Sequence, residues 1–149
     1  MNASRILPDL QCSLLCEDVR QEVTGNFMLA GIVSLLRVPQ VPVTHLRLFV
    51  FNRWTAGVGQ FTESVRLIAP DQTTVVKQGQ VRFTLQDATQ SMTNVTLLAQ
   101  VPFVAAGVYE VEVLVDDVMK LRYPLPVVVV QPAQRPAAPP PPETPPPDA

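Results

Sequence analysis

The stretch Gly107–Val130, GVYEVEVLVDDVMKLRYPLPVVVV, decides the fold. From Tyr109 to Val115 apolar residues alternate with acidic ones, and only Leu114 breaks the pattern. This is the two-residue period of a strand with one buried face. Asp116 and Asp117 then mark a turn, and the apolar alternation resumes beyond them. The stretch therefore predicts two long antiparallel strands joined by a tight turn.

Parity decides the length of this turn, because a one-residue slip would direct the apolar residues of the second strand toward water. A two-residue loop would place Val113 opposite Lys120. A three-residue loop, residues 116–118, keeps apolar residues together and is the one we expect. It aligns Val115 with Met119, Val113 with Leu121, Val111 with Tyr123 and Tyr109 with Leu125, and sets Glu112 beside Arg122. Such a hairpin needs an opposing sheet to cover its apolar face.

The rest of the chain contains short apolar segments that can form this opposing sheet, and residues typical of turns separate them. We expect further strands over residues 10–20, 26–38, 44–54, 61–69, 73–77, 81–85 and 95–101, with a turn at Gln78-Gly79. Residues 17–22 suit either a solvated connection or one helical turn. The apolar run 26–38 fits a buried strand or a short helix, and Gly31 with its β-branched neighbours favours the strand.

About nine strands and no helix predict an all-β, antiparallel β-sandwich. Gly107-Val108-Tyr109, at the start of a long strand, resembles the tyrosine corner of immunoglobulin-like domains. The cysteine pair and the strand tryptophan of antibody domains are missing. The sequence therefore predicts an immunoglobulin-like sandwich in the broad sense only.

Composition divides the chain into three parts. Residues 1–9 look like a loose leader, and residues 10–131 form the sandwich. Residues 132–149 hold 9 of the 16 prolines, and such a segment cannot bury enough apolar surface to order itself. We expect a disordered, proline-rich tail that acts as a solubilising spacer, with docking of Pro139–Pro142 to an aromatic groove as the less favoured alternative.

The net charge and the two cysteines limit the cellular compartment and the binding partners that we expect for this protein. A net charge of -2 and a pI near 5.3 give no electrostatic case for binding nucleic acid or an anionic membrane. No apolar run has signal-peptide or membrane-spanning character. Cys12 and Cys16 would stand about 13 Å apart on a strand, beyond disulfide reach. We therefore expect free thiols and a cytoplasmic protein.

Few residues suit catalysis. His45 is the one histidine, so a nucleophilic pair requires it to meet Cys12 or Cys16, with Asp18 as an orienting group. Cysteines on a strand more often belong to the core, and a histidine at a strand start is more often a surface residue. We expect no catalytic site, no cofactor and no enzymatic activity.

Four aspartates, Asp71, Asp87, Asp116 and Asp117, lie in expected turns. If they gathered at one end of the sandwich they would be weak candidates for a calcium site. Aspartate also favours turns for local reasons, because its side chain accepts hydrogen bonds from nearby backbone and tolerates positive φ. Turn chemistry explains each of them, and a calcium- or small-ligand-binding sandwich is the alternative function.

Aromatic residues of the strand 44–54 suggest a binding surface. Phe49, Phe51 and Trp54 are expected on the face opposite Leu46, Leu48 and Val50, where they would be exposed. Alternatively, residues 87–92 or the tail cover this face. We expect a binding or assembly module that acts through a protein partner or by self-association, with a homodimer formed through this face or an edge strand.

Two short patterns carry a family resemblance. Cys16-Glu17-Asp18-Val19-Arg20-Gln21-Glu22, followed by Gly25, Phe27 and Leu29-Ala30-Gly31-Ile32, together with the Gly107-x-Tyr109 hairpin, resembles a family of small uncharacterised bacterial proteins. The resemblance covers roughly residues 10–131. It implies a cytosolic all-β domain of bacterial origin and supplies no catalytic residues. Asp117 stands where such hairpins often carry glycine.

Overall fold

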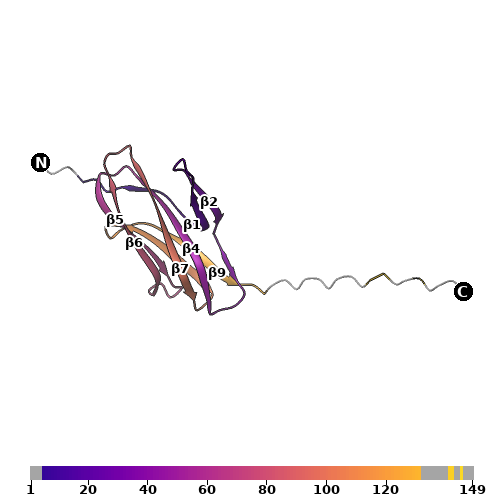
Figure 1. Ribbon diagram of the computed structural model, residues 1–149. Coiled ribbons are helices and arrows are strands. Elements are labelled where there is room, and N and C mark those ends of the chain that lie inside the picture. The colour runs from indigo at the N-terminus through magenta and orange to yellow at the C-terminus, as the bar shows by residue number, and fades with distance from the viewer. Residues whose placement is uncertain (1–4, 132–140, 143–144, 146–149) are drawn as a thin grey trace.

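The computed structural model describes residues 5–131, 141–142 and 145. This part of the chain folds into nine strands without a helix (Figure 1), which confirms the all-β prediction. The predicted disordered tail, residues 132–149, lies outside the described residues except for those three positions.

The strands form two sheets that pack face to face. One sheet has the order β2-β1-β4-β7 and the other has the order β3-β9-β8-β5-β6. The strands of the first sheet are β1 (Asp9–Gln21), β2 (Phe27–Ile32), β4 (Val43–Thr55) and β7 (Ser91–Phe103). Those of the second are β3 (Leu36–Val38), β5 (Gly59–Ile68), β6 (Val75–Leu85), β8 (Gly107–Val115) and β9 (Val118–Val129). All strand pairs are antiparallel except β3 with β9, which is parallel.

One apolar core fills the space between the sheets. It draws alternate residues from β4, β5, β7, β8 and β9, as expected of strands with one buried face. Tyr109 closes one end of this core, where its ring meets Phe103 edge-on at a centroid distance of 5.0 Å. Its hydroxyl donates a hydrogen bond to the carbonyl oxygen of Ala105 at 2.7 Å. This bond ties the connection before β8 to the start of that strand.

The β8–β9 hairpin has the expected register along its length but a different turn. The pairs from Val113–Leu121 to Tyr109–Leu125 are confirmed, as is Glu112 beside Arg122. The turn, however, contains only Asp116 and Asp117, and Val115 pairs with Val118. Both aspartates have positive φ, 46° and 64°, which suits the two-residue turns that match strand twist. A register shift between Val113 and Leu114 absorbs the extra residue and restores the parity.

The expected turn at Gln78-Gly79 is wrong, because β6 runs through it unbroken. A Cβ atom built on Gly79 would lie 2.7 Å from Cγ2 of Thr96 on β7. Glycine is therefore required there by the close approach of two edge strands, and not by a change of chain direction. The expected strand 26–38 is divided into β2 and β3.

The second half of β1 and all of β2 form a hairpin, residues 17–32, which we call the arm. Figure 1 shows it set off from the body of the two sheets. β1 pairs with β4 only as far as Cys16 and with β2 from Cys16 onward. Residues 21–26 at the tip are all exposed. The pattern read as a connection or helical turn at 17–22 therefore belongs to a β-hairpin.

Candidate functional site

A carboxylate lies sealed between the sheets. Glu63 on β5 is 0% exposed. Its Oε1 accepts a hydrogen bond from Nδ2 of Asn52 at 3.0 Å, and its Oε2 accepts from Nε1 of Trp54 at 2.6 Å and Nδ2 of Asn94 at 2.9 Å. These three donors come from β4 and β7 of the opposite sheet. The cluster therefore fastens the two sheets together by polar contacts within an apolar core.

This cluster was not identified from the sequence, although a signal for it exists. The inward-facing residues of β5 alternate as Phe61, Glu63, Val65 and Leu67, and a single acid in such a row must find donors inside the protein. Because no solvent reaches Glu63, the carboxylate has no access to a substrate. Its role is structural.

The aromatic residues expected on a partner surface are largely covered. Trp54 is 0% exposed and stacks on Phe83 at a centroid distance of 5.6 Å. By the two-residue period it shares the inward face of Leu48 and Val50, so its expected exposure is wrong. Phe51 does face outward, but it is only 7% exposed. Phe49 remains half-buried.

The arm covers this outer face. Phe27 at the start of β2 packs edge-on against Phe51, with ring centroids 5.8 Å apart. The arm was not one of the two segments considered above; of those, the tail lies outside the described residues, and Ser91 and Met92 lie beside Phe51 at the same groove. The arm therefore covers part of the surface that the sequence predicted to be exposed and to bind a partner.

A groove of about 600 Å³ runs between the arm and this sheet face. Gln21, Gly25, Asn26 and Phe27 line it from the arm, and Phe51, Arg53 and residues 91–93 line it from the sheet. Arg53 donates from Nη2 to Oγ of Ser91 at 3.0 Å. Its Nε is buried and has no hydrogen-bond partner among the described residues.

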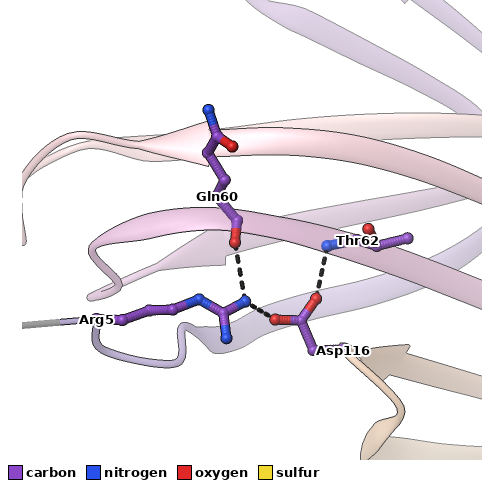
Figure 2. A network of polar contacts seen from close by, with 4 residues as sticks. All are labelled: Arg5, Gln60, Thr62 and Asp116. Carbon is purple, nitrogen blue, oxygen red and sulfur yellow. Dashed lines mark hydrogen bonds and ion pairs between the residues drawn. The ribbon is translucent and has the colours of Figure 1, made fainter.

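Residues 5–9, which the sequence suggested as part of a loose leader, are held against the sheets. Figure 2 shows the contact that does so: Arg5 forms an ion pair with Asp116 and donates to the carbonyl oxygen of Gln60 at 2.9 Å. Asp116 also accepts from the backbone N–H of Thr62 at 2.9 Å. The Arg5 guanidinium lies 4.8 Å from the centre of the Phe61 ring. This segment is therefore fixed to β5 and to the β8–β9 turn.

A polar pocket of about 510 Å³ opens beside this contact, lined in part by Thr62, Arg82 and Thr84. Arg5 and Asp116 both line this pocket, and the ion pair between them neutralises the charge of Arg5. The described residues that line the pocket supply the hydroxyl groups of Thr62 and Thr84 and one further cation, Arg82.

The candidate metal ligands do not gather. Asp71 lies in the β5–β6 turn, at the opposite end of β5 and β6 from Asp87, Asp116 and Asp117. Within the described chain, no three His, Cys, Asp or Glu side chains stand close enough to hold a metal ion. Asp71 and Asp87 instead accept hydrogen bonds within their own turns, from Thr73 and Thr74 and from Thr89 respectively. Each acts as a turn former.

Hydrogen bonds from the Thr74 hydroxyl and from the Thr74 and Thr73 N–H groups lower the pKa of Asp71 to about 2. A depressed pKa contributes stability above the unfolded value, near 3.9, and that contribution is lost as the pH falls toward 2. We expect the melting temperature of the wild type to fall more steeply between pH 4 and pH 2 than that of Asp71→Asn. Parallel melting curves across this range would contradict the role of the carboxylate.

The cysteines and His45 do not form a nucleophilic pair. Both cysteines are free thiols, and Cys16 is buried. Burial raises the pKa of Cys16, which disfavours the reactive thiolate. Cys16 pairs with Phe49, four residues along β4 from His45 and hence about 13 Å away. His45 packs against the ring of Phe103 instead.

A family model matches residues 11–128, nearly the whole two-sheet body, and its description is a family of unknown function, DUF6941. The chain belongs to this family. The resemblance noted from the arm and hairpin patterns is confirmed at the level of an uncharacterised family. The family supplies no activity and no site residues.

A second comparison matches a short segment of a much larger protein. The chain is 38% identical over 58 residues to the NAD-dependent malic enzyme of Schizosaccharomyces pombe. The match covers 39% of this chain and 10% of that protein, so it carries no inference about activity. Separately, no segment of the described chain forms a helix with the length and hydrophobicity that a membrane crossing requires.

Proposed function

We propose that this protein is a non-enzymatic binding module that forms a homodimer by pairing the edge strand β2 with β2 of a second copy. The observation that carries the proposal is the composition of that edge. From Phe27 to Ile32, FMLAGI, β2 has no charged residue and no proline. An exposed, uncharged, apolar edge strand presents free backbone groups to any chain that can pair with them.

The other edges of the two sheets carry the features that prevent such pairing. The part of β9 that β3 leaves unpaired, residues 118–126, contains Lys120, Arg122 and Pro124. β6 contains Lys77 and Arg82 and lies close to β7. β7 contains Pro102, and its backbone is irregular at Gln100, where φ is 50°. β3 is only three residues long. Among the edge strands of the described residues, β2 alone has six residues without a charge or a proline, and its one irregularity is Gly31, where φ is 66°.

The β2 edge is also complementary to itself. In an antiparallel pair centred on Ala30, Met28 of one copy lies opposite Ile32 of the other, and no charges face each other. Met28 and Ile32 are 51% and 59% exposed and lie on the same face of the arm. A β9–β9 pair centred on Leu121 would instead set Lys120 opposite Arg122, which is unfavourable. A twofold axis through β2 therefore satisfies the requirement of an isologous interface.

The proposal includes an immunoglobulin-like topology. The sheet β9-β8-β5-β6 opposes β1-β4-β7, and the chain crosses between the two sheets after β2, β3, β4, β6 and β7. The bond from Tyr109 to a carbonyl four residues upstream has the form of a tyrosine corner. A bacterial, cytoplasmic setting is also part of the proposal. The family resemblance supports the first, and two free thiols are typical of the second.

The alternative function, a calcium- or small-ligand-binding sandwich that uses the Asp-bearing turns, has less support. The oxygens of Asp71, Asp87 and Asp116 already accept hydrogen bonds or face Arg5. A calcium ion would have to displace these contacts.

Light scattering at increasing concentration tests the dimer. We expect the mass to rise from 16.3 kDa toward twice that value, at concentrations on the order of 100 μM because a six-residue edge buries a small area. Ala30→Lys should keep the protein monomeric, since it introduces facing cations at the twofold axis. The monomer should tolerate the change, because Ala30 is exposed and pairs with Asp18.

Leu46→Lys is the matched control, because Leu46 is 72% exposed and lies on β4, away from the free edge of β2. It should dimerise like the wild type. A wild type that stays monomeric at all concentrations, or an Ala30→Lys variant that dimerises normally, would rule out the β2 interface.

A further inference from the structure

Residues 5–7, which we call the strap, place one arginine in a site that three different groups form. Arg5 donates from Nη2 to the carbonyl oxygen of Gln60 at 2.9 Å and forms an ion pair with Asp116 (Figure 2). Its guanidinium lies over the Phe61 ring, 4.8 Å from the ring centre, a distance at which the ring attracts a cation. A carboxylate, a carbonyl oxygen and an aromatic face together suit a guanidinium group.

The parts of this site are positioned by contacts that do not involve the strap. Asp116 is bound to Thr62 in both directions. Its backbone N–H donates to the Thr62 carbonyl oxygen at 2.9 Å, and its Oδ1 accepts from the Thr62 N–H at 2.9 Å. These bonds leave Oδ2 for the arginine (Figure 2). A Cβ atom built on Gly59 would lie 3.0 Å from Cγ of Arg5, so the glycine makes room for the arginine stem.

The strap itself is attached by few contacts, and most of them lie at the surface. The N–H of Ile6 donates to the carbonyl oxygen of Val58 at 2.9 Å, and the N–H of Val58 donates to that of Ile6 at 3.0 Å. The Arg5 side chain is 51% exposed and Ile6 is 50% exposed, whereas Leu7 packs against the core. Each exposed contact contributes little, and segments held in this way open locally while the domain stays folded.

We propose that the site binds an extended segment of a partner protein that carries an arginine followed by an apolar residue, and that the strap is its intramolecular competitor. The strap is the evidence for the ligand, because it shows which chemical groups the site accepts. The partner's arginine takes the place of Arg5 against Asp116 and Gln60, and its next residue pairs with Val58. A pocket of about 510 Å³ beside Arg5 gives space for the rest of the segment.

The strap has an advantage over any free segment, because it belongs to the same chain. Its effective concentration at the site is on the order of millimolar. A free segment binds only to molecules in which the strap is open, and its apparent affinity is reduced by that fraction. The strap is therefore an autoinhibitory contact. It lies against the second sheet, whereas β2 belongs to the first, so this proposal and the proposed dimer can fail independently.

Hydrogen exchange in the wild type measures the opening of the strap directly. The amides of Ile6 and Val58 should exchange through local opening, and hence faster than the amide of Val65, which is paired with strands on both sides. Arg5→Gln should accelerate exchange at Ile6 and Val58 about two- to fivefold, because it removes the ion pair. Exchange at these two amides that is no faster than at Val65, or that Arg5→Gln leaves unchanged, would overturn the proposal.

The peptide acetyl-Arg-Ile-Leu-amide, which has the sequence of residues 5–7, tests binding in a nuclear magnetic resonance titration of the full chain. The variant Arg5→Ala/Ile6→Pro opens the site, because alanine lacks the guanidinium and proline lacks the N–H that donates to Val58. In this variant we expect the peptide to shift the amide signals of Val58 and Thr62. It should bind the wild type at least about tenfold more weakly. Equal binding to both proteins, or no shifts in the variant, would refute the proposal.

Two matched changes test the arginine contact in the opened variant. A peptide with citrulline, which has the shape of arginine without its charge, should bind about fivefold more weakly. Asp116→Asn should cause a similar loss, because asparagine can still accept from the Thr62 N–H but carries no charge. Asp117→Asn is the control: Asp117 also has positive φ, and it forms no ion pair within the described chain. Full binding of the citrulline peptide, or equal losses in the two aspartate variants, would contradict the site.

Discussion

Replacement of Glu63 by alanine is expected to reduce the free energy of unfolding by about 3–5 kcal/mol. The substitution leaves the N–H groups of Asn52, Trp54 and Asn94 without their acceptor inside a closed core. Each of these buried N–H groups then has no hydrogen-bond acceptor, from the protein or from water, and this destabilises the folded state. Urea denaturation monitored by fluorescence is well suited to the test, because Trp54 is the single tryptophan and donates to Glu63 itself.

The matched control is Glu110→Ala. Glu110 lies on the outer face of β8 and its side chain is 25% exposed. Its Oε2 atom is 3.7 Å from Nε of Arg122. Such a surface pair contributes about 1 kcal/mol at most. If Glu63→Ala costs no more than the control, the carboxylate does not hold the two sheets together.

Loss of the Tyr109 hydroxyl should also destabilise the protein. Tyr109→Phe removes the hydrogen bond to Ala105 but preserves the ring and its contact with Phe103. Because Tyr109 is 2% exposed, the loss should reduce the free energy of unfolding by about 1–2 kcal/mol. The measurement is again urea denaturation, with the free energy of unfolding extrapolated to water.

Tyr123→Phe provides the comparison. Its hydroxyl pairs with Oγ of Ser13 at 2.9 Å, and a serine hydroxyl can rotate to another partner more readily than a backbone carbonyl can. We expect the smaller loss of stability at Tyr123. The reverse order would argue against a tyrosine corner at the start of β8.

The parts of the fold that could be predicted from the sequence follow from the alternation of apolar and polar residues along the strands. It predicted both strands of the β8–β9 hairpin and most of their register, since a buried face allows only one parity. It did not reveal the turn, because two aspartates with positive φ and a compensating bulge produce the same parity as a three-residue loop. The bulge left one trace in the sequence, because Leu114 breaks the alternation at the position of the register shift.

Tertiary contacts account for the other differences. Gly79 has the composition of a turn, yet it is required by the approach of Thr96 from β7. Phe51 has the pattern of an exposed aromatic residue, yet the arm reaches it from about 25 positions earlier in the chain. No local pattern records which distant segment will cover a face.

The candidate sites also fall into two groups, those that the residue pattern could have predicted and those that depend on tertiary contacts. Parity alone, applied consistently, would have placed Trp54 in the core beside Val50 and Glu63 among the inward-facing residues of β5. The groove at Arg53 depends on how the arm folds back, so the sequence around Arg53 gives no indication of it.

The central functional claim is that β2 pairs with β2 of a second copy, and residue-resolved hydrogen exchange at low and high protein concentration tests it most directly. The account predicts that amides between Phe27 and Ile32 exchange more slowly at high concentration, while those of Val127–Val129, already paired with β3, do not change. New protection along β6, β7 or β9, or none at all while the mass doubles, would contradict it.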